Sequence, residues 1–133
     1  MTASQEFTEP PIPTDAELRI LRVLWERGGS TVREVLDELS GDRAVGYTTV
    51  LKLLQIMHEK RLVARDERAR THVYTARVAE QRTERRLVSD LIDRAFSGSA
   101  ATLVMRALSD RPASAEELEE IRRQIDRLQE EGR

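Results

Sequence analysis

Cysteine is absent from this 133-residue chain, and aromatic residues are scarce. The absence of cysteine excludes disulfide bonds and thiolate metal sites. Aromatic residues make up 4% of the chain and hydrophobic residues 39%, so a core can form but must be largely aliphatic. No apolar run approaches the roughly 18 residues of a membrane helix, and no segment resembles a signal peptide. We therefore expect a cytoplasmic protein with one domain, or with a small domain and an appendage.

Groups that commonly carry catalysis or hold metals are also few. The only histidines, His58 and His72, have no obvious carboxylate at ligand spacing, and His58-Glu59 lacks the second histidine of a zinc-protease helix. There is no glycine-rich phosphate loop, and no set of serine, histidine and aspartate stands out. We predict that the chain is not an enzyme and holds no metal or cofactor, and we identify no small-molecule substrate.

Positive charge is concentrated in the middle of a chain whose net charge is −2. Residues 1–42 carry four arginines against nine acids, or −5, and residues 78–133 carry ten basic residues against twelve acids, or −2. Residues 43–77 carry eight basic residues against three acids, or +5. A basic patch on an otherwise acidic protein suits reversible binding to nucleic acid. In a chain that is 35% charged, such clustering can also arise by chance.

The stretch from Gly46 to Val63 has the pattern of an amphipathic helix. Its apolar side carries Val50, Leu53, Leu54 and Met57, and its polar side carries Thr48, Lys52 and Gln55, with Thr49 on the flank. The unpaired N–H groups and partial positive charge of its first turn favour a nearby phosphate. Such a helix can lie in a major groove with its N-terminal end against the bases. The alternative is an ordinary amphipathic helix with a solvated face.

Two shorter helices are expected before this stretch. Thr14 with Glu17, and Thr31 with Glu34, have the spacing of capping boxes. The first helix continues through Leu18, Leu21, Leu24 and Trp25 to Gly28-Gly29, and the second through Val32, Val35, Leu36 and Leu39. A turn at residues 40–42 then leads toward the amphipathic stretch. Two helices joined by a turn, the second with an outward polar face, are typical of a helix-turn-helix motif.

A β-hairpin is expected next. Residues 62–65 and 71–75 have strand character, and residues 66–70 form the loop between them. The arginines at or beside its tip are Arg65, Arg68 and Arg70. A helix-turn-helix followed by an arginine-tipped hairpin is typical of a winged helix, whose wing lies along phosphates or enters the minor groove. Alternatively, these arginines form salt bridges with the two acids of the loop.

From Val78 onward the pattern is entirely helical, with breaks near Ser97-Gly98-Ser99 and Pro112 and a further capping box at Ser114 and Glu117. The apolar positions assigned to dimerisation are Leu87, Leu91, Phe96, Leu103, Val104, Leu108, Leu118, Ile121, Ile125 and Leu128. In the last helix they follow heptad spacing. These helices have more apolar surface than they can bury among themselves, so we expect a second copy of the chain to cover it. The alternative is that they fold back on the helix-turn-helix.

Together these features predict a mainly α fold: a flexible segment at 1–13, a winged-helix DNA-binding domain at 14–77 and a helical dimerisation domain at 78–133. The expected partner is a palindromic double-stranded operator, bound by a homodimer that represses transcription. The predicted DNA-contacting residues are Arg43, Tyr47, Thr48, Thr49, Lys52, Gln55, Arg65, Arg68 and Arg70. A winged helix used for protein–protein interaction is the competing hypothesis.

The sequence also resembles the penicillinase-repressor family of winged-helix regulators (BlaI, MecI and CopY types). The matching residues are Thr14-Asp-Ala-Glu-Leu-Arg-Ile-Leu-Arg-Val-Leu-Trp25, Thr31-Val-Arg-Glu-Val35, Gly46-Tyr-Thr-Thr-Val50 with Leu54, Lys60-Arg-Leu-Val63 and Tyr74. The resemblance implies a homodimeric repressor of genes connected with β-lactam or metal response. In the antibiotic branch it also implies a membrane sensor-protease pathway that cuts the dimerisation region and separates the half-sites.

Several positions depart from the family pattern. The Asn-Phe pair cut in the antibiotic-responsive members aligns with Arg106-Ala107, so these residues mark the equivalent of the cleavage region. The cysteine motif of the copper-responsive members is absent. Arg61 replaces a common glycine, so that helix end needs another means of termination, and Ala69 replaces a frequent wing glycine.

Overall fold

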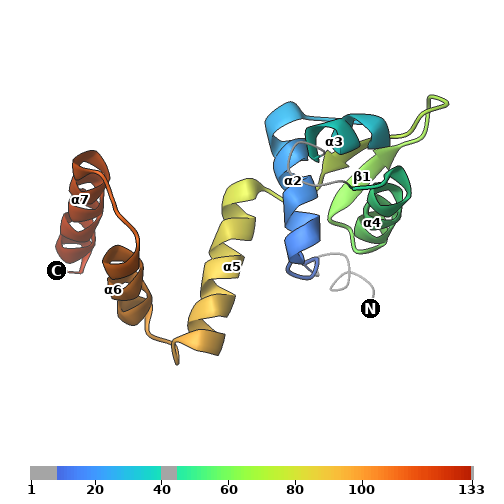
Figure 1. Ribbon diagram of the computed structural model, residues 1–133. Coiled ribbons are helices and arrows are strands. Elements are labelled where there is room, and N and C mark those ends of the chain that lie inside the picture. The colour runs from blue at the N-terminus through green and yellow to red at the C-terminus, as the bar shows by residue number, and fades with distance from the viewer. Residues whose placement is uncertain (1–8, 40–44, 133) are drawn as a thin grey trace. The chain divides into compact units, whose positions relative to one another are not determined.

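The computed structural model describes residues 9–39 and 45–132 (Figure 1). These residues form two compact units, which divide between Leu87 and Val88. The first unit contains the predicted winged helix, and the division falls within helix α5 (Glu80–Ala95). No helix among the described residues has the length and apolar character needed to span a membrane.

Helices α2 (Asp15–Arg27) and α3 (Val32–Leu39) begin at the predicted capping boxes. The Thr14 N–H donates to Glu17 Oε1 at 2.9 Å, and the Glu17 N–H donates to Thr14 Oγ1 at 3.2 Å. The same reciprocal pair of bonds, with the same two distances, starts α3. Gly28 ends α2 in the left-handed region at φ 87°, where a residue without a Cβ atom is favoured. The predicted turn at 40–42 lies outside the described residues.

Helix α4 (Tyr47–Glu59) occupies most of the predicted amphipathic stretch. The chain leaves it through Arg61, which takes the left-handed conformation at φ 68° although it is not glycine. This backbone geometry costs roughly 1–2 kcal/mol for a residue with a Cβ atom. Ala69 needs no such conformation, since Arg61 and Ser97 are the non-glycine residues with positive φ in the described part of the chain.

The hairpin is confirmed, with each strand displaced slightly from its predicted position. Strands β1 (Val63–Asp66) and β2 (Val73–Ala76) pair antiparallel, with Arg65 opposite Tyr74. Tyr74 also exchanges backbone hydrogen bonds with Ser30, at 2.8 and 2.9 Å, which ties the segment before α3 to the hairpin.

One aliphatic core joins α2, α3, α4 and the hairpin. Its buried hydrophobic residues are Ile20, Leu21, Val23, Leu24, Val32, Val35, Leu36, Val50, Leu54, Met57, Leu62, Val63 and Tyr74. Trp25, predicted to be a core residue, is half-buried against this core, and its Nε1–H donates to the carbonyl of Val78 at 2.9 Å. Ile20 and Val23 are buried although the predicted apolar positions of α2 did not include them.

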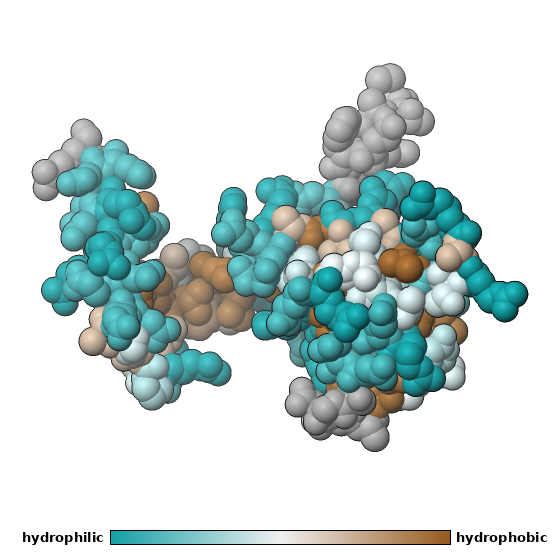
Figure 2. Space-filling model, turned by 90° about the horizontal axis from the view of Figure 1, so that it is seen from above, coloured by the Kyte–Doolittle hydropathy of each residue, from teal (hydrophilic) through white to brown (hydrophobic). Residues whose placement is uncertain are grey.

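The remaining chain forms helices α5, α6 (Ala100–Asp110) and α7 (Ala115–Glu131), with breaks where the sequence predicts them. Ser114 and Glu117 form the predicted capping box. Beyond Thr83, no described side chain is buried within the chain. Figure 2 shows brown apolar side chains at the surface of these helices.

Candidate nucleic-acid interface

Helix α4 separates apolar from polar residues as predicted. Val50, Leu54 and Met57 are completely buried, and Leu53 packs partly buried against the same core. The exposed side carries Thr48, Thr49, Lys52 and Gln55, which we call the α4 polar row. Since the opposite side is fixed in the core, this row is presented to solvent by a rigid element.

The beginning of α4 is electrostatically different from that of α2. Gly46 stands at the N-cap and offers no side-chain acceptor, and the first turn contains no acidic residue. At the N-terminal end of α2, the capping box and the acidic residues of the first turn already supply a hydrogen-bond acceptor and negative charge. The first-turn N–H groups of α4 therefore remain available to an external acceptor, such as a phosphate oxygen.

The other end of α4 is anchored by an ion pair between a half-buried lysine and a buried carboxylate. Lys60 Nζ lies 2.7 Å from Oε2 of Glu17, a side chain that is only 2% exposed. Burial alone would raise the pKa of Glu17, but hydrogen bonds from Lys60 and from Thr14 N–H, together with the lysine charge, hold this pKa below its ordinary value. The pair joins the start of α2 to the C-cap of α4 and so helps to fix the orientation of the polar row.

The wing arginines differ in their local partners. Arg65 Nε lies 2.6 Å from Glu67 Oε2, and Arg68 forms hydrogen bonds with both carboxylate oxygens of Asp66. The hydrogen bonds from Arg68 lower the pKa of Asp66 to about 2. Arg70 is exposed and forms no ion pair within the described ranges. The salt-bridge alternative therefore applies to Arg65 and Arg68, yet the Arg68 side chain is still 91% exposed.

Comparison with known proteins identifies the family. The profile of the penicillinase repressor family matches residues 13–127. The chain belongs to the penicillinase repressor family. The penicillinase repressor of Bacillus licheniformis is 25% identical over 111 residues, which cover 84% of this chain and 87% of the relative. Members of the penicillinase repressor family are DNA-binding transcriptional repressors and not enzymes, which confirms both predictions at that level.

Two solved structures from the penicillinase repressor family are also similar. The solution structure of monomeric Bacillus licheniformis BlaI with the blaP half-operator shares 27% identity, with a TM-score of 0.48, and covers 55% of this chain and 89% of that chain. The solution structure of the DNA-binding domain of the repressor BlaI shares 27% identity, with a TM-score of 0.49. The match covers 56% of this chain and 90% of that chain.

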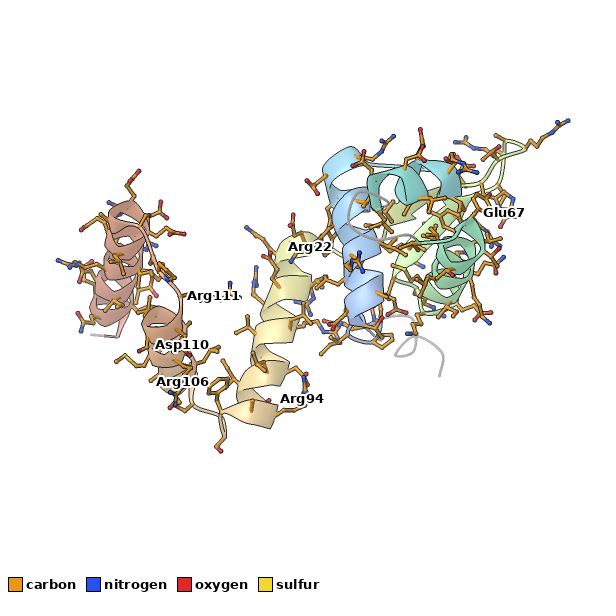
Figure 3. The ribbon with its side chains drawn as sticks, in the orientation of Figure 1. Arg22, Glu67, Arg94, Arg106, Asp110 and Arg111 are labelled. Atoms are coloured by element: carbon orange, nitrogen blue, oxygen red, sulfur yellow. The ribbon has the colours of Figure 1, made fainter. Side chains whose placement is uncertain are left out.

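In this penicillinase-repressor chain the predicted contact residues lie on two elements. Tyr47 is exposed at the first position of α4, next to the polar row, and the three arginines lie on the hairpin. Figure 3 shows Glu67 at the hairpin end of the winged-helix unit. Arg43 lies outside the described residues.

Arg33, which the sequence analysis did not single out, lies close to Tyr47. Its guanidinium carbon lies 5.2 Å from the centre of the Tyr47 ring, so it stands beside the N-terminal end of α4. The available signal was an arginine in the first turn of α3, the helix that comes before α4.

Proposed function

We propose that this chain represses transcription as a homodimer that recognises a palindromic operator by sequence. The α4 polar row is the observation that carries the proposal, because it combines hydroxyl, ammonium and amide groups on one rigid helix. These groups suit direct contacts to base edges in the major groove. Membership in the penicillinase repressor family supports the same assignment.

Within this proposal, Lys52 contacts a base and the wing arginines contact phosphates. Replacing Lys52 by alanine should reduce discrimination between operator and unrelated DNA by roughly 1–3 kcal/mol. If Lys52 contacted only phosphate, the variant would weaken binding to all sequences alike, and the base-contact assignment would be wrong. Replacing Arg70 should reduce affinity with little change in specificity.

The homodimer part of the proposal rests on the exposed apolar side chains of α5, α6 and α7. They include Val88, Leu91, Val104, Met105, Leu108, Leu118, Ile125 and Leu128. We propose that a second copy of the chain buries this surface, since large exposed apolar patches commonly mark interaction sites. Linking two DNA-binding domains makes the second half-site contact intramolecular and raises overall affinity.

We propose that derepression acts on this dimerisation region, through cleavage of the chain by a membrane sensor-protease pathway. Arg106 and Ala107 are both exposed within α6, and Figure 3 shows Arg106 on this helix. Cutting there would separate the two half-site contacts and remove the advantage of linkage. A recognition sequence for an unrelated protease, inserted at this pair, tests the idea: digestion should weaken operator binding without unfolding the winged helix. Unchanged operator affinity after complete digestion would contradict it.

Gel-shift titration of the full chain with duplex from upstream of its own gene tests the main proposal. Affinity should fall steeply with salt, by about 0.9 in log–log slope for each phosphate neutralised. A palindromic site should compete better than a shuffled duplex of equal length. Absence of any preference for a palindromic site would favour a protein–protein interaction module instead.

A further inference from the structure

Arg33 and Tyr47 form a cation–π pair between the two helices of the helix-turn-helix. The distance of 5.2 Å from the guanidinium carbon to the ring centre is within the roughly 6 Å range of a cation–π interaction. Arg33 is exposed, and Tyr47 is 43% exposed. Neither side chain is therefore needed to fill the core, and the pair lies at the surface beside Thr48.

The charge of Arg33 is not neutralised by a neighbouring carboxylate in the described part of the chain. This distinguishes it from Arg27, which pairs with Glu34 and Glu38, and from Arg68 on the wing, which pairs with Asp66. The cation–π contact engages the charge of the guanidinium group. Its N–H donors lie in the guanidinium plane and remain available to an anion beside the ring.

We infer that Arg33 is a further DNA-contacting residue: it binds a backbone phosphate and holds the Tyr47 ring against the methyl group of an operator thymine. This inference rests on the proposed function and adds a positioning residue and a base contact to it. Phosphate contacts fix a protein on the duplex, whereas apolar contact with the thymine methyl carries sequence information. The cation–π pair joins the two roles, because the phosphate contact fixes the arginine and the arginine fixes the ring.

The first experiment measures the salt dependence of binding by Arg33→Gln in the full chain. The probe is a duplex of roughly 30 base pairs selected from a random library, long enough for two half-sites. Loss of one phosphate contact per half-site should lower the log–log salt slope by about 0.9 for each half-site. Arg22→Gln is the matched control, because Arg22 is an exposed arginine of α2 and lies on the opposite side of the unit from Glu67 in Figure 3.

The second experiment replaces each operator thymine in turn by deoxyuridine, which removes only the methyl group. Wild-type protein should lose about fourfold in affinity at the thymine that Tyr47 contacts. Tyr47→Leu should lose that sensitivity, whereas Tyr47→Phe should keep it, because the ring makes the contact. Arg33→Gln and Tyr47→Leu should be non-additive, with a coupling of about two- to fivefold.

The possible failures are distinguishable. Wild-type protein that shows no salt-dependent, sequence-selective duplex binding would overturn the proposed function and this inference together. Normal wild-type binding with an unchanged slope for Arg33→Gln would overturn the inference alone. Additive effects of Arg33→Gln and Tyr47→Leu, or uracil sensitivity retained in Tyr47→Leu, would likewise reject the coupled contact while leaving the α4 polar row in place.

Discussion

The winged-helix unit and the C-terminal unit use similar sequence patterns but bury their apolar residues very differently. In the first unit, Ile20, Val35 and Leu54 are buried completely, and the other core residues are at most 9% exposed. In the second, none of the described apolar side chains is buried, and eight large ones, from Val88 to Leu128, are between 38% and 65% exposed. Helical periodicity therefore shows that a helix has an apolar face, and the partner of that face depends on what the rest of the chain, or another chain, brings to it.

The largest effect expected from this difference concerns assembly. The double variant Leu118→Glu/Ile125→Glu places charge on the apolar side of α7, which a second copy would have to bury. We expect a monomer by sedimentation and a 10²- to 10⁴-fold loss of operator affinity, on the order of the gain from linkage.

The matched control adds the same charge at polar, exposed positions of α7, as Gln124→Glu/Gln129→Glu. It should remain a dimer with nearly unchanged affinity. A Leu118→Glu/Ile125→Glu chain that still sedimented as a dimer would show that α7 is not the interface.

The next largest effect concerns the free energy of unfolding and compares two leucines, one in each unit. Leu54→Ala removes a completely buried side chain from the core of the first unit and should lower the free energy of unfolding by about 3 kcal/mol. Leu128→Ala, at a position 56% exposed in the chain, should leave the unfolding of the winged-helix unit unchanged. Urea unfolding followed by Trp25 fluorescence measures both, and equal effects would refute the difference between the units.

Breaking an ion pair should also cost more stability in the first unit than in the second. Lys60→Met leaves the Glu17 carboxylate buried without its cation, and we expect a loss of about 2 kcal/mol in the free energy of unfolding. Arg94→Met breaks the exposed pair with Asp90 on α5, which should cost less than about 0.5 kcal/mol. Figure 3 shows Arg94 on this helix.

The Glu17 pair also predicts a pH dependence. The pKa of Glu17 is lower in the folded chain than its ordinary value of 4.5, so folding is stabilised above that value. This stabilisation should decline as the pH falls through the folded pKa. Urea midpoints between pH 7 and about 3 should show a smaller decline in Lys60→Met than in the wild-type chain, and parallel curves would contradict the assignment.

The smallest effect concerns backbone strain. Arg61→Gly relieves the left-handed geometry after α4 and should raise the stability of the winged-helix unit by up to about 1 kcal/mol. Ser97→Gly makes the corresponding change in the second unit, at φ 51°, and should not shift the unfolding of the first. Thermal melts of the two variants give the comparison, and a lower melting temperature for Arg61→Gly would mean that its side chain stabilises the fold.

Local features of the fold were predictable from residue spacing. The capping boxes depend on residues three apart and were correctly placed at Thr14, Thr31 and Ser114. The apolar side of α4 followed from one helical period. In α2, by contrast, Ile20 and Val23 are also buried, because α3, α4 and β2 all contact this helix and cover more of it than a single stripe.

Contacts between distant residues were not predictable in the same way. Arg33 and Tyr47 meet because α3 and α4 pack against each other, and nothing in their sequence spacing requires it. Glu17 and Lys60 are 43 positions apart, and their pairing was equally hidden. The salt bridges of the wing were expected only as an alternative, because neighbouring charges in a loop can turn toward each other or toward solvent.

The sequence by itself determined the helices, their caps, the hairpin and the basic middle of the chain, because these depend on periodicity and on groups a few residues apart. Tertiary structure alone decided which apolar faces found a partner within the chain, which buried carboxylate was paired, and which arginine came to lie over Tyr47 of α4. The physical reason is that burial and electrostatic pairing depend on distance in space, which chain folding sets between residues far apart in sequence.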